Sequence, residues 1–84
     1  MPYITPERRY ALDEVPEPET PGELNYVLTV FADDYVTRQG LSYATLAEVI
    51  SSFECAKLEF YRRVVAPYED TKIEANGDVY NDRG

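Results

Sequence analysis

The sequence contains no histidine, no tryptophan and only one cysteine among its 84 residues. Without histidine the chain cannot form a Ser-His-Asp or Cys-His catalytic site, and one cysteine excludes an intrachain disulfide and a Cys/His zinc site. Cys55 has Glu54 beside it and no histidine to activate it, so we expect a buried, inert thiol. The residue types therefore predict a non-catalytic protein without a metal or a cofactor.

Positive charge is scarce: 8 Lys and Arg stand against 16 Asp and Glu, which gives a formal net charge of -8. A chain with this charge repels polyanions, so duplex nucleic acid is not an expected partner. The acidity is concentrated in the terminal segments, because residues 1–21 and 67–84 carry -3 each and residues 22–66 carry only -2. A local anion site within the helical body is therefore compatible with the overall charge.

Long apolar runs are also absent. No run approaches the roughly 20 residues of a membrane span, and the opening MPYITPERRY has no signal-peptide core, so we expect a cytoplasmic protein that does not enter a membrane. Hydrophobic residues make up 44% of the chain, which is enough for a folded domain. Domains this short usually need a disulfide, a metal or oligomerisation for stability, and we therefore expect a homo-oligomer.

The first 20 residues are expected to form an extended arm, because five of the six prolines lie within residues 1–21. Thr5 and Pro6 favour one short helical turn over residues 6–10. The arm also carries several apolar side chains. We expect it to lie across the helical body of the same subunit or of a neighbouring one.

The first main helix is predicted over about residues 21–39. Thr20 and Glu23 form a capping box, Pro21 occupies the first helical position, and Gly40 follows the end. One apolar stripe recurs at helical spacing: Leu24, Val27, Leu28, Phe31 and Tyr35.

The second main helix is predicted over about residues 43–66, with Ser42 as its N-cap. Its apolar stripe consists of Leu46, Val49, Ile50, Phe53, Phe60 and Val64. After Phe53 a second stripe begins at Leu58, so the helix is apolar on more than one side. Such a helix must be covered on more than one side, which again favours association between subunits.

Pro67 is expected to break or kink the second helix near residues 65–66. Beyond it we favour a short C-terminal helix over about residues 67–75, which ends at Asn76-Gly77, over a hairpin at the same residues. The sequence thus predicts a single all-α domain with two main antiparallel helices, a short third helix and an extended arm. The helical body spans residues 21–76, and residues 77–84 form a polar tail.

Arginine pairs and tyrosines form the candidate ligand site. Guanidinium groups bind phosphate or carboxylate through two parallel hydrogen bonds, and tyrosine rings stack on planar ligands. The candidate residues are Arg62, Arg63, Tyr61, Tyr68, Arg8, Arg9 and Tyr3. Glu59 precedes Arg62 and Arg63 by three and four residues and is able to neutralise one of them, so an ion pair within the helix is the competing interpretation.

The acidic residues do not have the spacing of a metal site. Glu48, Glu54 and Glu59 are separated by six and five residues, neither of which places two carboxylates on one helical face. A Mg²⁺-dependent all-α nucleotide pyrophosphohydrolase is therefore the weakest of the functional hypotheses.

Several segments resemble a family of short uncharacterised proteins from phages and bacteria. The similarity lies in MPYI at residues 1–4, PGELNY at 21–26, LAEVI at 46–50, FECAKLEFYRRVVAPYED at 53–70 and NGDVY at 76–80. The resemblance implies a phage context, in which small proteins act on host machinery from the host cytoplasm. It implies no activity.

Two hypotheses remain. In the first, an oligomer sequesters a small anionic, nucleotide-like ligand. This hypothesis rests on an analogy with other small phage proteins, which counteract bacterial defence by sequestering nucleotide signals. In the second, the acidic surface docks on a basic face of a host protein, which makes the chain an inhibitor or adaptor.

Overall fold

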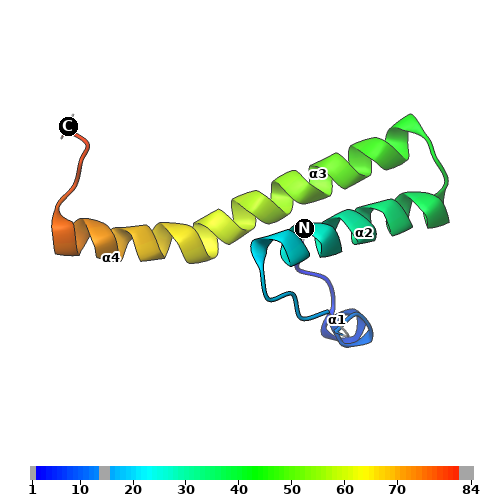
Figure 1. Ribbon diagram of the computed structural model, residues 1–84, viewed down its shortest axis with the longest axis horizontal. Coiled ribbons are helices and arrows are strands. Elements are labelled where there is room, and N and C mark those ends of the chain that lie inside the picture. Colours follow the sequence, from blue (N-terminus) through cyan, green and yellow to red (C-terminus); the bar gives the residue numbers. More distant parts are fainter. Residues whose placement is uncertain (1, 14–15, 82–84) are drawn as a thin grey trace.

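The computed structural model describes residues 2–13 and 16–81, and within these residues the protein is helical and contains no strand (Figure 1). The elements are α1 (Pro6–Ala11), α2 (Pro21–Gln39), α3 (Tyr43–Phe60), a π-helical segment (Tyr61–Val65) and α4 (Ala66–Asn76). The all-α prediction is confirmed. Residue 1, residues 14–15 of the arm and residues 82–84 of the expected tail lie outside the described part.

The predicted caps form at the starts of the helices. The hydroxyl of Thr20 accepts a hydrogen bond from the backbone N–H of Glu23 at 3.1 Å, and Thr5 does the same for Arg8 at 3.3 Å. The carboxylate of Glu23 reaches one residue further back than a capping box predicts, because it accepts from the N–H of Glu19 at 3.0 Å. The chain is therefore fixed on both sides of Thr20 where the arm enters α2.

A short connection at residues 40–42 joins α2 to α3. Gly40 has φ +95°, a value that a side chain at this position would strain, and its N–H closes α2 by donating to the carbonyl of Val36 at 2.8 Å. Ser42 then caps α3 by accepting from the N–H of Thr45 at 3.1 Å. Thr45, at 7% exposure, is the one residue in the described part of the chain that is buried.

Pro67 does not break the helix. Val65 and Ala66 both keep right-handed helical dihedrals, so the chain remains helical from Tyr43 to Asn76. The π-helical segment explains this, because the N–H of Ala66 bonds to the carbonyl of Tyr61, five residues back. The wider turn gives the proline ring room that a regular α-helix lacks. Of the two expected outcomes near residues 65–66, the break is therefore wrong, whereas a kink is present: α4 continues the rod that α3 begins, and the rod changes direction between them (Figure 1).

The preference for a helix over a hairpin near the C-terminus is confirmed, since α4 runs to Asn76 and ends at Gly77, which has φ +89°. None of the helices within residues 2–13 and 16–81 is at once long enough and apolar enough to cross a membrane.

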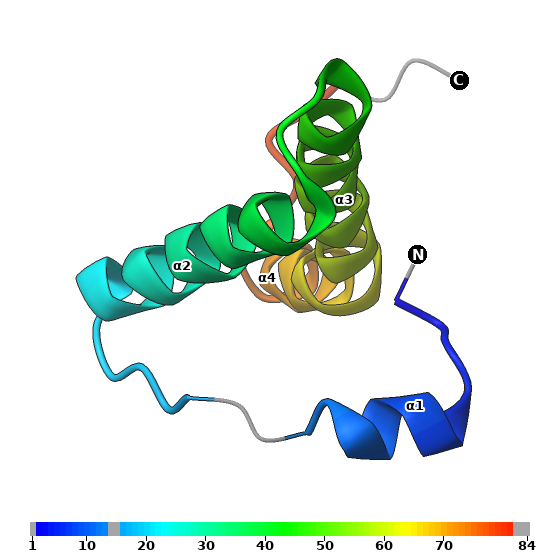
Figure 2. The same ribbon diagram turned by 90° about the vertical axis from the view of Figure 1, so that its right-hand side faces the viewer.

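The helices do not form a compact body. α2 and α3 diverge from their connecting residues, and α4 extends away from both (Figures 1 and 2). The dimensions are 49 × 29 × 29 Å and the radius of gyration is 17.4 Å. A compact domain of this length has a radius of about 12 Å. The antiparallel packing of the two main helices stays a prediction.

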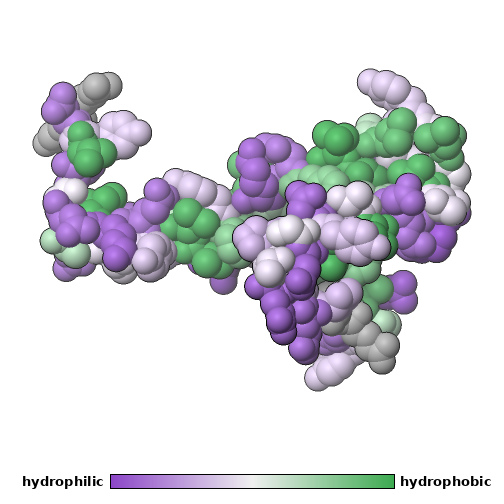
Figure 3. Space-filling view, in the orientation of Figure 1, coloured by the Kyte–Doolittle hydropathy of each residue, from purple (hydrophilic) through white to green (hydrophobic). Residues whose placement is uncertain are grey.

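A hydrophobic core is missing from the described residues: no apolar side chain is buried there. Phe31 is 50% exposed, Phe53 41% and Phe60 60%. Apolar surface gathers at the end where α2 and α3 are joined and again along the rod (Figure 3). The stripes that the sequence predicts are therefore present on the helices, and all of their side chains stay at least partly exposed.

Candidate functional site

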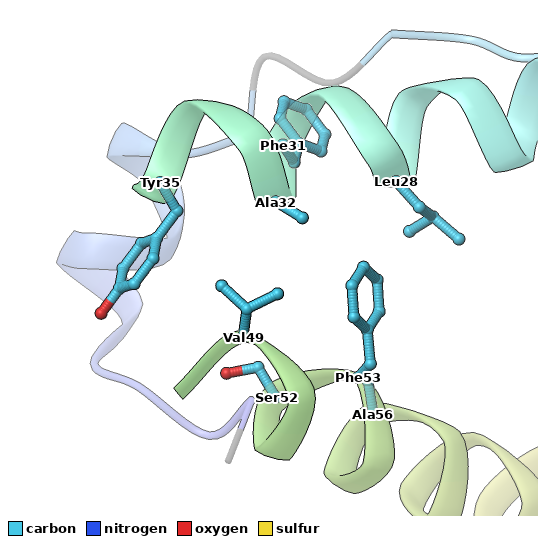
Figure 4. A pocket seen from close by; sticks show the side chains of 8 residues that line it. All are labelled: Leu28, Phe31, Ala32, Tyr35, Val49, Ser52, Phe53 and Ala56. Atoms are coloured by element: carbon cyan, nitrogen blue, oxygen red, sulfur yellow. The ribbon is translucent and has the colours of Figure 1, made fainter. Parts of the chain in front are cut away.

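A groove lies between α2 and α3. It has a volume of about 320 Å³. Leu28 and Phe53 point into it from opposite helices (Figure 4). The lining consists of Leu28, Phe31, Ala32, Tyr35, Val49, Ser52, Phe53 and Ala56. None of these side chains carries a formal charge, so the groove suits an apolar occupant.

The lining follows one rule on both helices. On α2 it falls at positions i, i+3, i+4 and i+7 counted from Leu28, and on α3 at the same intervals counted from Val49. These intervals place all four residues on one face of a helix. The larger members belong to the predicted stripes. The three small ones, Ala32, Ser52 and Ala56, were missed because they contribute little to hydrophobic periodicity.

Tyr35 marks the end of the groove nearest the connection. Its hydroxyl donates a hydrogen bond to the carboxylate of Glu48, which joins α2 to α3. This bond, together with desolvation, raises the pKa of the Tyr35 hydroxyl above its ordinary value. At the opposite end no such link is present among the described residues, and the helices diverge there.

The apolar stripe of α3 continues beyond the groove. Phe60 and Val64 follow Phe53 by seven and eleven residues, about two and three helical turns, and so lie on the same side of the rod. This part of the rod has no other described helix beside it (Figure 1). The stripe is therefore longer than the cover that α2 provides.

A polar cluster centred on Glu59 lies near the end of α3. Its carboxylate accepts a hydrogen bond from the hydroxyl of Tyr3 and another from the guanidinium of Arg62 at 2.6 Å. The bond from Tyr3 and then the bond from Arg62 lower the pKa of Glu59 below its ordinary value. The same two bonds raise the pKa of the Tyr3 hydroxyl and of Arg62.

The arm contacts the body through this cluster. Pro2 lies against α3, where it lines a small hollow with Ser52, Cys55 and Ala56, and Tyr3 reaches Glu59. The expectation that the arm lies across the body is confirmed at residues 2 and 3 within one chain. In contrast, α1 stands away from the other helices and has no buried residue (Figure 2).

The predicted ligand residues do not form one site. Tyr3 and Arg62 meet at Glu59, and Arg63 is close enough for its charge to act on both Tyr3 and Glu59. Tyr61 points elsewhere: its hydroxyl donates to Glu69 at 2.6 Å, which raises the pKa of Tyr61.

Three further predicted ligand residues lie outside the cluster. The ring of Tyr68 on α4 has the ammonium group of Lys72 5.5 Å from its centre. Arg8 and Arg9 lie in the last turn of α1, on the separate part of the arm. The structure thus brings together Tyr3, Arg62 and Arg63 from the predicted set.

Two other expectations concern metal and thiol chemistry. In residues 2–13 and 16–81 no group of three His, Cys, Asp or Glu side chains is placed to hold a metal ion. Cys55 is exposed, so the expectation of a buried thiol was wrong. Among the described helices α2 is the one that packs alongside α3, and Cys55 does not line the groove between them but a small hollow that it shares with Pro2.

Comparison with known families identifies the family of this chain. Residues 1–79 match the family described as a domain of unknown function (DUF6899). The chain belongs to this family. The match covers the arm, all the described helices and the first residues after α4. No curated protein and no solved structure shows significant similarity to it.

Proposed function

We propose that this member of the DUF6899 family is a non-catalytic protein that works by binding other protein chains. The observation that carries the proposal is the exposure of its apolar residues: the described chain has no buried apolar side chain, yet it has an uncharged groove and a long apolar stripe. Large exposed apolar surfaces on helical proteins mark sites of protein association. A helix of a partner fits such a groove by laying its own apolar face into it.

The charge distribution indicates the chemistry of a heterologous partner. The acidity lies in the terminal segments, where α4 carries Glu69, Asp70 and Glu74, and it is absent from the groove lining. We propose that these segments bind a basic face of a host protein, which makes the chain an inhibitor or adaptor. Association between opposite charges is fast and sensitive to salt.

Affinity capture tests this role with a charge-neutralised variant. Tagged wild-type chain is expected to retain a partner from host lysate at roughly 0.05 M salt and to release it at roughly 0.5 M, where screening is strong. Asp70→Asn combined with Glu74→Gln is expected to abolish retention. Asp34→Asn combined with Glu54→Gln removes two acidic groups of the body and is the matched control, which should keep the partner. Retention of the partner at high salt, and also by the variant at Asp70 and Glu74, contradicts the proposal.

A second candidate function is sequestration of a small anionic, nucleotide-like ligand. One observation favours it: the arm brings Tyr3, an aromatic ring, to the helix end that carries Arg62 and Arg63. Glu59 opposes it, because this carboxylate already occupies the guanidinium of Arg62. An anion binds here only after it displaces Glu59 or binds to Arg63 instead.

Calorimetry against cyclic and linear nucleotides separates this candidate from the first. If the cluster binds anions, Glu59→Gln strengthens binding, because it removes the competing charge and frees Arg62. Arg62→Ala with Arg63→Ala should abolish binding. Absence of heat with the wild type and with Glu59→Gln at millimolar nucleotide eliminates the candidate, and it leaves the protein-binding role untouched.

A further inference from the structure

The exposed surface of the chain is too large for a protein that is folded on its own. The accessible area is 7830 Å². A compact monomer of 9.6 kDa exposes about 5,100 Å², so each chain exposes an excess of about 2,700 Å². A standard interface buries about 800 Å² on each partner, and obligate dimers bury more. The excess is therefore sufficient for an obligate interface.

A chain without a core needs its partner in order to fold. The partner must then be present whenever and wherever the chain is made, and in matching amount. A second copy of the same chain meets this condition by itself. Charge does not oppose this choice, since the groove lining is uncharged and residues 22–66 carry a net charge of only -2.

Two features of the chain are complementary. The groove between α2 and α3 is apolar and open to solvent, and the rod beyond it carries Phe60 and Val64, which are exposed. Two copies related by a twofold axis satisfy both needs at once, because in such a dimer each copy gives to the other the surface that it receives. Side chains of Phe60 and Val64 are large enough to occupy part of a space of about 320 Å³.

We infer that the protein is an obligate homodimer in which the stripe at Phe60 and Val64 of each copy fills the α2–α3 groove of the other. The groove of each copy is thus occupied by the other copy. This dimer rests on the proposed function only in that the groove binds a protein chain. The acidic segments of α4 and of the arm remain available to a further partner.

Disulfide trapping between copies tests the arrangement. Both variants carry Cys55→Ser, which removes the one native thiol. One copy then carries Ala32→Cys in the groove and the other carries Val64→Cys on the stripe. Oxidation of the mixture is expected to give a mixed disulfide in clear excess over the disulfides that each variant forms alone. Disulfides formed equally well by either variant alone, or none at all, overturn the inference.

The native mass and a matched pair of substitutions provide an independent check. The wild type should have a mass of about 19 kDa, twice that of one chain. Val64→Asp should raise the dissociation constant roughly 30-fold or more, as expected for an interface centre. Val79→Asp is the control, because Val79 is 90% exposed and lies beyond the helices, and it should change the constant less than about twofold. A monomeric wild type refutes the dimer, and equal effects of the two substitutions refute the interface at Val64. Neither result bears on the salt-sensitive capture of a host protein.

Discussion

The two halves of the long rod have similar apolar stripes and different surroundings. Along α3, Val49 and Phe53 face α2 across a groove, and Tyr35 links the two helices through Glu48. At the end of α3 and in the π-helical segment, Phe60 and Val64 continue the stripe where no described helix faces it. Hydrophobic burial drives folding in proportion to the apolar area removed from water, so the second half is stable only if another chain covers it.

The largest effect on stability is expected from a substitution that enlarges the groove. Phe53→Ala removes the aromatic side chain that projects from α3 toward α2 (Figure 4). If the groove is filled in solution, the substitution should lower the free energy of unfolding by about 3 kcal/mol or more, as for a buried phenylalanine. Chemical denaturation followed by circular dichroism measures the loss.

Tyr43→Ala is the control for that substitution. Tyr43 lies at the start of α3 and is 91% exposed, so its replacement should change stability by less than about 0.5 kcal/mol. Equal losses for Phe53→Ala and Tyr43→Ala would mean that the groove is as open to water in solution as the tip of the helix.

The two glycines that end helices allow the covered and the exposed parts of the chain to be compared, since both have positive φ. Gly40 connects the two walls of the groove, and Gly77 follows the uncovered end of α4. Gly40→Ala should destabilise the protein by about 1–3 kcal/mol, because the helices on both sides hold the backbone in its strained conformation. Gly77→Ala should cost much less, because the chain beyond it is free to relax. Thermal unfolding of both variants measures the difference, and equal shifts would contradict the distinction.

The smallest effect concerns the attachment of the arm at Glu59. Its pKa lies below the ordinary value of 4.5, so its contribution to stability is present above that value and is lost as pH falls through the lowered pKa. The pKa of Tyr3 lies above its ordinary value of 10.0, so its contribution is present below pH 10.0 and is lost as pH rises through the raised pKa. We therefore expect the arm to detach from α3 at both extremes of pH while the helices persist.

Ring NMR signals of Tyr3, assigned with Tyr3→Phe, follow this detachment. Glu59→Gln should release the arm at neutral pH as well. Glu54→Gln is the control. Among the described residues the Glu54 carboxylate pairs only with the ammonium group of Lys57, at 3.5 Å, so this substitution should leave the Tyr3 signals in place. Signals of Tyr3 that do not change with Glu59→Gln would show that the arm is held elsewhere.

Local signals in the sequence predicted the helices well. The caps at Thr20, Ser42 and Gly40 involve only neighbouring backbone groups, so a few residues of sequence are enough to predict them. At Pro67 the sequence left a break and a kink open, because the outcome depends on how the preceding turn adjusts, and the change to π-helical bonding at Tyr61–Val65 has no simple sequence signal.

The candidate site was predictable only in part. The apolar stripes led to the prediction that the helices need more cover than one chain provides, and this prediction is the basis of the inferred dimer. The pairing of Tyr3 with Glu59 joins residues that are 56 positions apart, and no helical spacing reveals such a contact. The groove depends equally on small residues, such as Ala32 and Ala56, which mark the lining only when the two helices are placed together.

The inferred dimer requires that this chain folds by associating with a second copy. Helix content and native mass, measured together on dilution from high to low concentration, test it most directly. For an obligate dimer the apparent stability depends on chain concentration, so we expect helicity to fall together with the loss of the dimer. A monomer that keeps its full helix content at every concentration would contradict the account.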